Sequence, residues 1–134
     1  MGIDVHMFAE RKVGGSWEYV PSVEFDERDY NLFDILQGKS PCWGKIRSTA
    51  CETIAGLPED MSSHVHEQAS QCGEYDFGHH HATLRQLKGH DWSDLSSVSD
   101  EMKQGGESFV TETIPQLEGF GSPDDVRVVY WFSR

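Results

Sequence analysis

Apolar and polar residues alternate along residues 3–10, and this period of two is typical of a β-strand. Gly14-Gly15 then precedes Ser16–Val20, whose aromatic and β-branched residues suit a second strand, so the two segments predict a hairpin. The alternation divides the first strand into two faces: Ile3, Val5, Met7 and Ala9 on one, and Asp4, His6, Phe8 and Glu10 on the other.

The end of the chain predicts a further strand over residues 126–132. Apolar side chains occupy both of its faces, with Val128 and Tyr130 on one and Val129 and Trp131 on the other. A strand that is apolar on both faces is more often central than at an edge of a sheet. We therefore expect it to lie beside the N-terminal hairpin.

The remaining segments predict helices and two long loops. Residues 37–56 and 71–81 show no helical or strand periodicity and are expected to be loops. Helices are expected over residues 30–36, 57–69, 83–89 (opened by the capping box Thr83-x-x-Gln86), 93–104 and 108–117, the last interrupted at Pro115. Residues 1–134 thus predict one α+β domain, a three- or four-stranded antiparallel sheet with four to five short helices packed on one side.

Charge and cysteine content narrow the classes of function. The chain has 11 basic and 23 acidic residues, a net charge of −12, which disfavours binding to a nucleic-acid backbone or to an anionic membrane surface. Cys42, Cys51 and Cys72 form no CxxC pair and leave an odd thiol, so a disulfide framework is not expected. The N-terminus does not follow the pattern of a signal peptide, and we expect a cytoplasmic protein.

Histidines and carboxylates form the first candidate site. Asp4 and His6 share a strand face about 6.5–7 Å apart, and His79-His80-His81 follow Asp76 in the second long loop. If that loop folds over the first strand, its residues meet Asp4 and His6 in an N/O site suited to zinc, manganese or iron. The metal ligands would be Asp4, His6, His79 and His81, with Asp76 as the catalytic base of a hydrolase acting on a phosphodiester or nucleotide. The alternative is a structural role, because no HExxH or CxxC motif is present.

Acidic residues form the second candidate site. Nine acids and one base, Lys103, lie between Asp91 and Asp125, so this stretch carries −8 of the net charge. Carboxylates on the outer face of two helices can imitate a nucleic-acid backbone and occupy a basic groove on another protein. The alternative is an ordinary solvated helix face. The residues expected to contact a partner are Asp94, Asp100, Glu101, Glu107, Glu112 and Glu118.

Several short segments, taken in order, resemble a known family. They are MGIDVHMFAE (1–10), WEY (17–19), RDYNLF (28–33), GLPED (56–60), HHHATL (79–84), IPQL (114–117) and PDDVRVVYWF (123–132). Together they are similar to small proteins of bacteriophages and prophages. Those proteins open with the pattern MG(C/I)D(I/V)H and close with a strand of the form DVR-x-V-x-WF. The chain departs from this pattern at Ser133-Arg134, where the family more usually has an acidic and an amide residue.

The resemblance implies a phage accessory protein in the cytoplasm of an infected bacterium, and it assigns no catalytic residue. Combined with the acidic stretch, it favours a protein that binds and modulates a host protein. The partner would be a nucleic-acid-processing complex or a defence complex, as for an anti-CRISPR protein. The metal-dependent hydrolase is the alternative, favoured by the Asp and His residues of the recurring segments.

Overall fold

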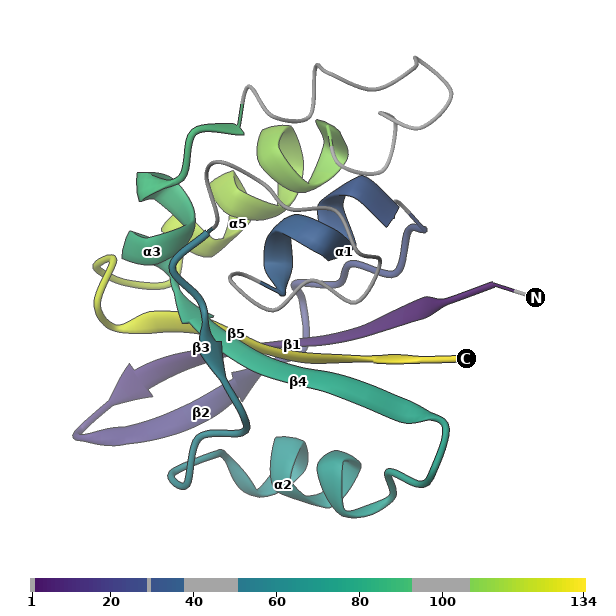
Figure 1. Cartoon of the computed structure of the whole chain (residues 1–134). Coiled ribbons are helices and arrows are strands. Elements are labelled where there is room, and N and C mark those ends of the chain that lie inside the picture. Colours follow the sequence, from purple (N-terminus) through teal and green to yellow (C-terminus); the bar gives the residue numbers. More distant parts are fainter. Residues whose placement is uncertain (1, 29, 38–50, 93–106) are drawn as a thin grey trace.

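The computed structural model describes residues 2–28, 30–37, 51–92 and 107–134. Within these ranges the chain forms a five-stranded antiparallel sheet in the order β2-β1-β5-β4-β3, with helices on both faces (Figure 1). The strands are β1 (Asp4–Val13), β2 (Ser16–Val20), β3 (Ile54–Ala55), β4 (Asp76–Thr83) and β5 (Val126–Ser133). The helices are α1 (Tyr30–Leu36), α2 (Ser63–Ser70), α3 (Leu84–Gly89), the π-helix η2 (Phe109–Thr113) and α5 (Ile114–Glu118). The predicted α+β class is confirmed, although the sheet has more strands than expected.

The C-terminal strand β5 is the centre of the sheet, as its sequence predicts. It pairs with β1 on one side and β4 on the other, and residues 126–132 are all buried. The N-terminal hairpin is confirmed as well. Gly14 and Gly15 turn between β1 and β2 with φ values of +58° and +84°, which only glycine adopts without strain. No helix in the described ranges is both long and apolar enough to cross a membrane.

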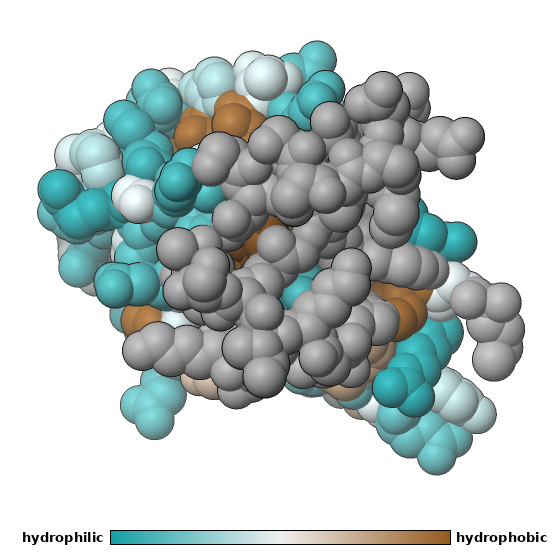
Figure 2. Space-filling view, turned by 45° about the horizontal axis from the view of Figure 1, so that its top comes forward, coloured by the Kyte–Doolittle hydropathy of each residue, from teal (hydrophilic) through white to brown (hydrophobic). Residues whose placement is uncertain are grey.

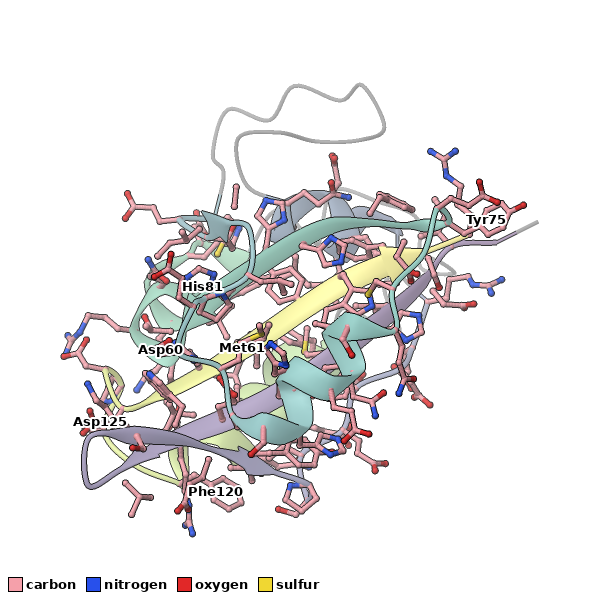
Figure 3. The ribbon with its side chains drawn as sticks, turned by 90° about the horizontal axis from the view of Figure 1, so that it is seen from below. Asp60, Met61, Tyr75, His81, Phe120 and Asp125 are labelled. Atoms are coloured by element: carbon pink, nitrogen blue, oxygen red, sulfur yellow. The ribbon has the colours of Figure 1, made fainter. Side chains whose placement is uncertain are left out.

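The two faces of the sheet support separate cores. The larger core lies between the sheet and α1, α3, η2 and α5, and the smaller one lies under α2, which crosses the opposite face (Figures 1 and 3). The expectation that the helices pack on one side was wrong for α2. Val129 and Trp131 of β5 point to this second face, and Val65 of α2 covers them. A sheet with apolar residues on both faces requires a helix on each.

Strand β4 contains the three histidines His79, His80 and His81. The prediction that residues 71–81 form a loop was therefore wrong for residues 76–81. A β-bulge explains their orientation: Phe77 pairs with Phe132 and His80 with Tyr130, which leaves Gly78 and His79 together opposite Trp131. Gly78 has a φ of +67°, and a Cβ there would lie 2.8 Å from the Phe132 ring. The bulge keeps His80 on the main-core face and turns His79 toward α2.

Helix α3 begins as the sequence predicts, whereas α2 does not. Both bonds of the capping box are present, from the Gln86 N–H to the Thr83 hydroxyl and from the Thr83 N–H to the Gln86 side chain. Helix α2 starts at Ser63 rather than at residue 57, with Ser62 as its N-cap. The preceding Asp60 is held outside the helix by hydrogen bonds from Arg127 and Trp17.

The expected interruption at Pro115 is confirmed and takes the form of the π-helix η2. The Ile114 N–H bonds to the Phe109 carbonyl, five residues back, immediately before Pro115 enters the first turn of α5. Proline has no N–H to continue the ladder, so the backbone changes its hydrogen-bond register there. The helix expected over residues 93–104 lies outside the described residues.

Candidate functional site

Polar residues from both ends of the chain meet on the α2 side of the sheet, near the edge where both termini lie (Figure 1). Ser133 of β5 pairs with Asp4 of β1 and with Asp76 of β4, so the three residues form a row across adjacent strands. Trp131 pairs with His6 and stacks against His79, which gives a second row. We call these residues the sheet-end site: Asp4, His6, Asp76, His79, Trp131 and Ser133.

The His6 imidazole links the two rows. Its Nε2 atom lies 2.7 Å from the Ser133 Oγ atom, at hydrogen-bond distance, although the His6 backbone is opposite Trp131. The imidazole therefore reaches into the space between Asp4 and Asp76. Because His6 is exposed, this nitrogen can be reached by a ligand from solvent.

The two aspartates hold different partners. Arg28 donates to the Asp4 Oδ1 atom at 2.7 Å, and both side chains are more than half exposed. The Gly73 N–H donates to Asp76 at 2.7 Å, in the turn that leads into β4. The charge of Asp76, after burial, also contributes to raising the pKa of the neighbouring Cys72 thiol. Asp4 is therefore paired with a cation, whereas Asp76 accepts from the backbone.

His79 sits beside a buried indole. Trp131 is only 4% exposed, and its ring stacks with His79 at 5.5 Å and with His6 at 6.2 Å between centroids. Desolvation lowers the pKa of His79, and the nearby Asp76 charge opposes this shift only in part. A neutral imidazole at pH 7 retains the lone pair that a metal ion or a proton requires.

Of the residues that the sequence assigned to a metal or catalytic site, four come together and one does not. Asp4, His6, Asp76 and His79 occupy the two rows. His81 lies farther along β4, opposite Val129, and its Nδ1–H donates to the Gly56 carbonyl at 2.9 Å. Figure 3 shows His81 well away from Tyr75, the residue that precedes Asp76.

In the described ranges, no three His, Cys, Asp or Glu side chains are already arranged to hold a metal ion. Two features of the sheet-end site account for this. The Trp131 indole lies between the strands that carry His6 and His79, and Arg28 occupies one oxygen of Asp4.

The acidic stretch is described only in part. Asp94, Asp100 and Glu101 lie outside the described residues, whereas Glu107, Glu112 and Glu118 are exposed. The expectation that carboxylates face solvent opposite buried Ile114 and Leu117 holds for these three. Figure 2, which brings the helical side forward, shows a largely hydrophilic coloured surface with smaller apolar areas. Lys88 lies 3.6 Å from Glu118, so part of this charge is balanced locally.

Sequence reasoning missed the contribution of Ser133, Arg28 and Trp131. The register between β1 and β5, which brings residue 133 beside residue 4, is not visible in either strand alone. One signal was present, because the sequence departs at Ser133-Arg134 from the proteins that it resembles, and Ser133 lies in the row between the two aspartates.

No protein-family model, curated protein or solved structure matches this chain. What the site does is inferred from its residues and their arrangement.

Proposed function

We propose that the sheet-end site binds one divalent metal ion and hydrolyses a phosphodiester or nucleotide. The observation that carries this proposal is the position of the His6 Nε2 atom at Ser133, in the row between Asp4 and Asp76. Two carboxylates and an imidazole from β1 and β4 then surround the small side chain of Ser133 on β5, the strand between them. This donor set suits zinc, manganese or iron.

The strand spacing is compatible with one ion shared by both aspartates. Asp4 and Asp76 lie on either side of β5, so their Cα atoms are about 10 Å apart, twice the usual spacing between strands. Two aspartate side chains and two metal–oxygen bonds of about 2.1 Å span that distance. Ser133 leaves the space between them open because its side chain is small.

Binding requires Asp4 to exchange Arg28 for the ion, and this exchange is inexpensive. The Arg28–Asp4 pair is more than half exposed on both sides, and exposed ion pairs contribute about 0–1 kcal/mol. A released Arg28 guanidinium would lie beside the bound metal, where it can contact a phosphate oxygen. The same displacement would therefore free a cation for the substrate.

The proposed chemistry follows from the charges. Two carboxylates alone would repel a phosphate, whereas a divalent ion held by Asp4, His6 and Asp76 would neutralise them and would supply an activated water. His79, whose pKa is lowered by desolvation, would accept the proton of the water that attacks phosphorus and pass it to the leaving oxygen as its bond to phosphorus breaks.

The test is hydrolysis of bis(p-nitrophenyl) phosphate by untagged protein, with and without Mn²⁺ or Zn²⁺. We expect metal-dependent release of p-nitrophenol that Asp4→Asn and His6→Ala reduce by at least about 100-fold. Asp26→Asn and His66→Ala are matched controls, because both residues are exposed outside the site. Activity that needs no metal, or that survives both site substitutions, would contradict the proposal.

The second candidate function is binding of a host protein through the acidic helical face. It is favoured by the exposure of Glu107, which precedes η2, and of Glu112 within η2, while Phe109 and Thr113 of the same helix are buried. Together with the resemblance to phage proteins, this face supports an accessory role in which carboxylates occupy a basic groove of a defence or nucleic-acid-processing complex.

Its test is capture of a partner from bacterial lysate, followed by measurement of the affinity at increasing salt. Glu112→Lys should weaken the complex, and Glu67→Lys, on α2 across the sheet, is the matched control. A complex that is insensitive to salt and to Glu112→Lys would show that the acidic face is ordinary surface.

A further inference from the structure

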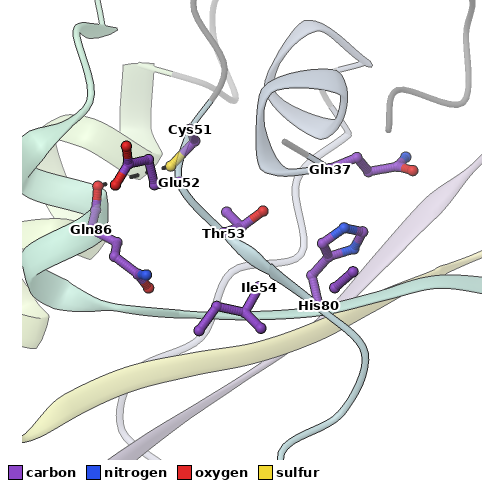
Figure 4. A pocket seen from close by; sticks show the side chains of 8 residues that line it. Gln37, Cys51, Glu52, Thr53, Ile54, His80 and Gln86 are labelled. Carbon is purple, nitrogen blue, oxygen red and sulfur yellow. Dashed lines mark hydrogen bonds between the residues drawn. The ribbon is translucent and has the colours of Figure 1, made fainter. Parts of the chain in front are cut away.

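A second concave site lies on the main-core face of the sheet, away from the sheet-end site. It is a pocket of about 310 Å³ between the end of α1, the segment leading into β3, strand β4 and helix α3 (Figure 4). That volume is at the lower end of the range of about 300–1,000 Å³ for small-molecule sites. The described lining residues are Gln37, Cys51, Glu52, Thr53, Ile54, Ala55, His80 and Gln86.

The charge of the described lining residues favours an uncharged ligand over an anion. None of the described lining residues is Lys or Arg, and Glu52 is the one carboxylate among them. Burial, followed by the Glu52 charge, raises the pKa of the Cys51 thiol to about 11, so the thiol is uncharged at neutral pH. A phosphate or carboxylate would find no cation among the described lining residues and would lose its hydration.

The polarity of the pocket is set by two buried side chains. His80 is 6% exposed and stacks on the Tyr130 ring at 6.0 Å, which fixes the plane of its imidazole. Its Nδ1 atom lies 2.9 Å from the Gly78 carbonyl. Because a carbonyl only accepts, Nδ1 donates this hydrogen bond, and in the tautomer that the bond selects Nε2 is the acceptor.

Gln37 complements this acceptor. Its side chain is 1% exposed and approaches the same glycine, since its Oε1 atom would lie 3.3 Å from a Cβ built on Gly78. A primary amide supplies both a donor and an acceptor. Figure 4 shows the amide and the imidazole at one side of the pocket, with Cys51 and Gln86 at the other.

We propose that this pocket binds an uncharged ring in which an N–H group lies beside a carbonyl, as in a nucleobase such as uracil. The ring N–H would donate to the His80 Nε2 atom, and the carbonyl would accept from the Gln37 amide. Ile54, which is 47% exposed at the rim, would cover the apolar edge of the ring.

The test is isothermal titration calorimetry with uracil and with orotate, which is the same ring bearing a carboxylate. We expect one uracil bound per chain and orotate at least about tenfold weaker, because its carboxylate meets no Lys or Arg among the described residues that line the pocket. Uracil that does not bind, or orotate that binds equally well, would overturn the proposal.

Three variants make the test specific. His80→Phe keeps a ring against Tyr130 but removes the acceptor, and it should weaken uracil binding about tenfold. Ile54→Trp fills the rim from an exposed position and should abolish binding even if His80→Phe fails to fold. His66→Phe, on α2 across the sheet, should change nothing. Uracil binding that both pocket variants retain would overturn the proposal whatever the outcome of the metal titrations.

Discussion

A buried ion pair between β5, the central strand, and its neighbour β1 gives the sharpest test of the fold. Glu10 of β1 and Arg127 of β5 are register partners, with side chains 0% and 6% exposed, and their Oε1 and Nε atoms lie 2.7 Å apart. The other Glu10 oxygen accepts the Ser62 N–H at 2.7 Å. Arg127 also donates to Asp60 at 2.9 Å and lies 4.0 Å from the Trp17 ring centroid.

Replacing Arg127 by Met leaves the Glu10 carboxylate buried without its cation. Breaking a buried pair in this way costs about 3–5 kcal/mol, a large share of the 5–15 kcal/mol typical of a whole domain. The double variant Glu10→Gln with Arg127→Met removes both charges. It should lose only about 1–2 kcal/mol, mainly the exposed Asp60 bond and the contact with Trp17.

The assay is urea denaturation followed by tryptophan fluorescence and far-UV circular dichroism. Arg85→Met is the matched control, because its partner Asp124 forms an equally short but exposed pair, and this variant should unfold like the wild type. The reasoning is refuted if Arg127→Met unfolds within about 1 kcal/mol of the wild type, or if the double variant is no more stable than the single one.

Three further predictions concern stability. Gly14→Ala should lower the free energy of unfolding by about 1–2 kcal/mol, because alanine is strained at a φ of +58°. Gly78→Ala should lower it by more, because a Cβ at this position also meets the Phe132 ring. Thermal denaturation of the two variants tests this order. Thr83→Ala removes the N-cap acceptor of α3 and should lower the free energy of unfolding by about 1 kcal/mol in urea. Desolvation alone would raise the pKa of Asp60, but the hydrogen bond and the charge of Arg127 lower it in the folded state. Asp60 therefore stabilises the fold above its unfolded-state pKa near 4, and this stabilisation is lost as the pH falls through the lower folded-state pKa. Asp60→Asn should flatten the pH dependence of the melting temperature in that acidic range.

Local signals in the sequence predicted several parts of the fold. The alternation in residues 3–10, the two apolar faces of residues 126–132 and the capping box each act within a few residues, and all three are confirmed. Strand β4 was missed because Gly78 and three histidines carry no strand propensity. Its conformation is imposed by pairing with β5, which no local pattern reveals.

The sequence predicted which kinds of residue form the candidate site, but not how the strands bring them together. Asp4 and His6 share a face because a strand alternates, so that part followed from the sequence. The approach of Asp76 and His79 depends on β5 lying between β1 and β4 and on the bulge at Gly78. Both are tertiary features, and they also explain why His81, two residues beyond His79, lies elsewhere.

Metal binding at the sheet-end site is the most direct test of the proposed function. Titration calorimetry of untagged protein with Mn²⁺ should give one saturable site per chain. That binding should be lost in Asp4→Asn and in Asp76→Asn and retained in Asp26→Asn. An absence of saturable binding, or binding that both site variants retain, would contradict the assignment of this site.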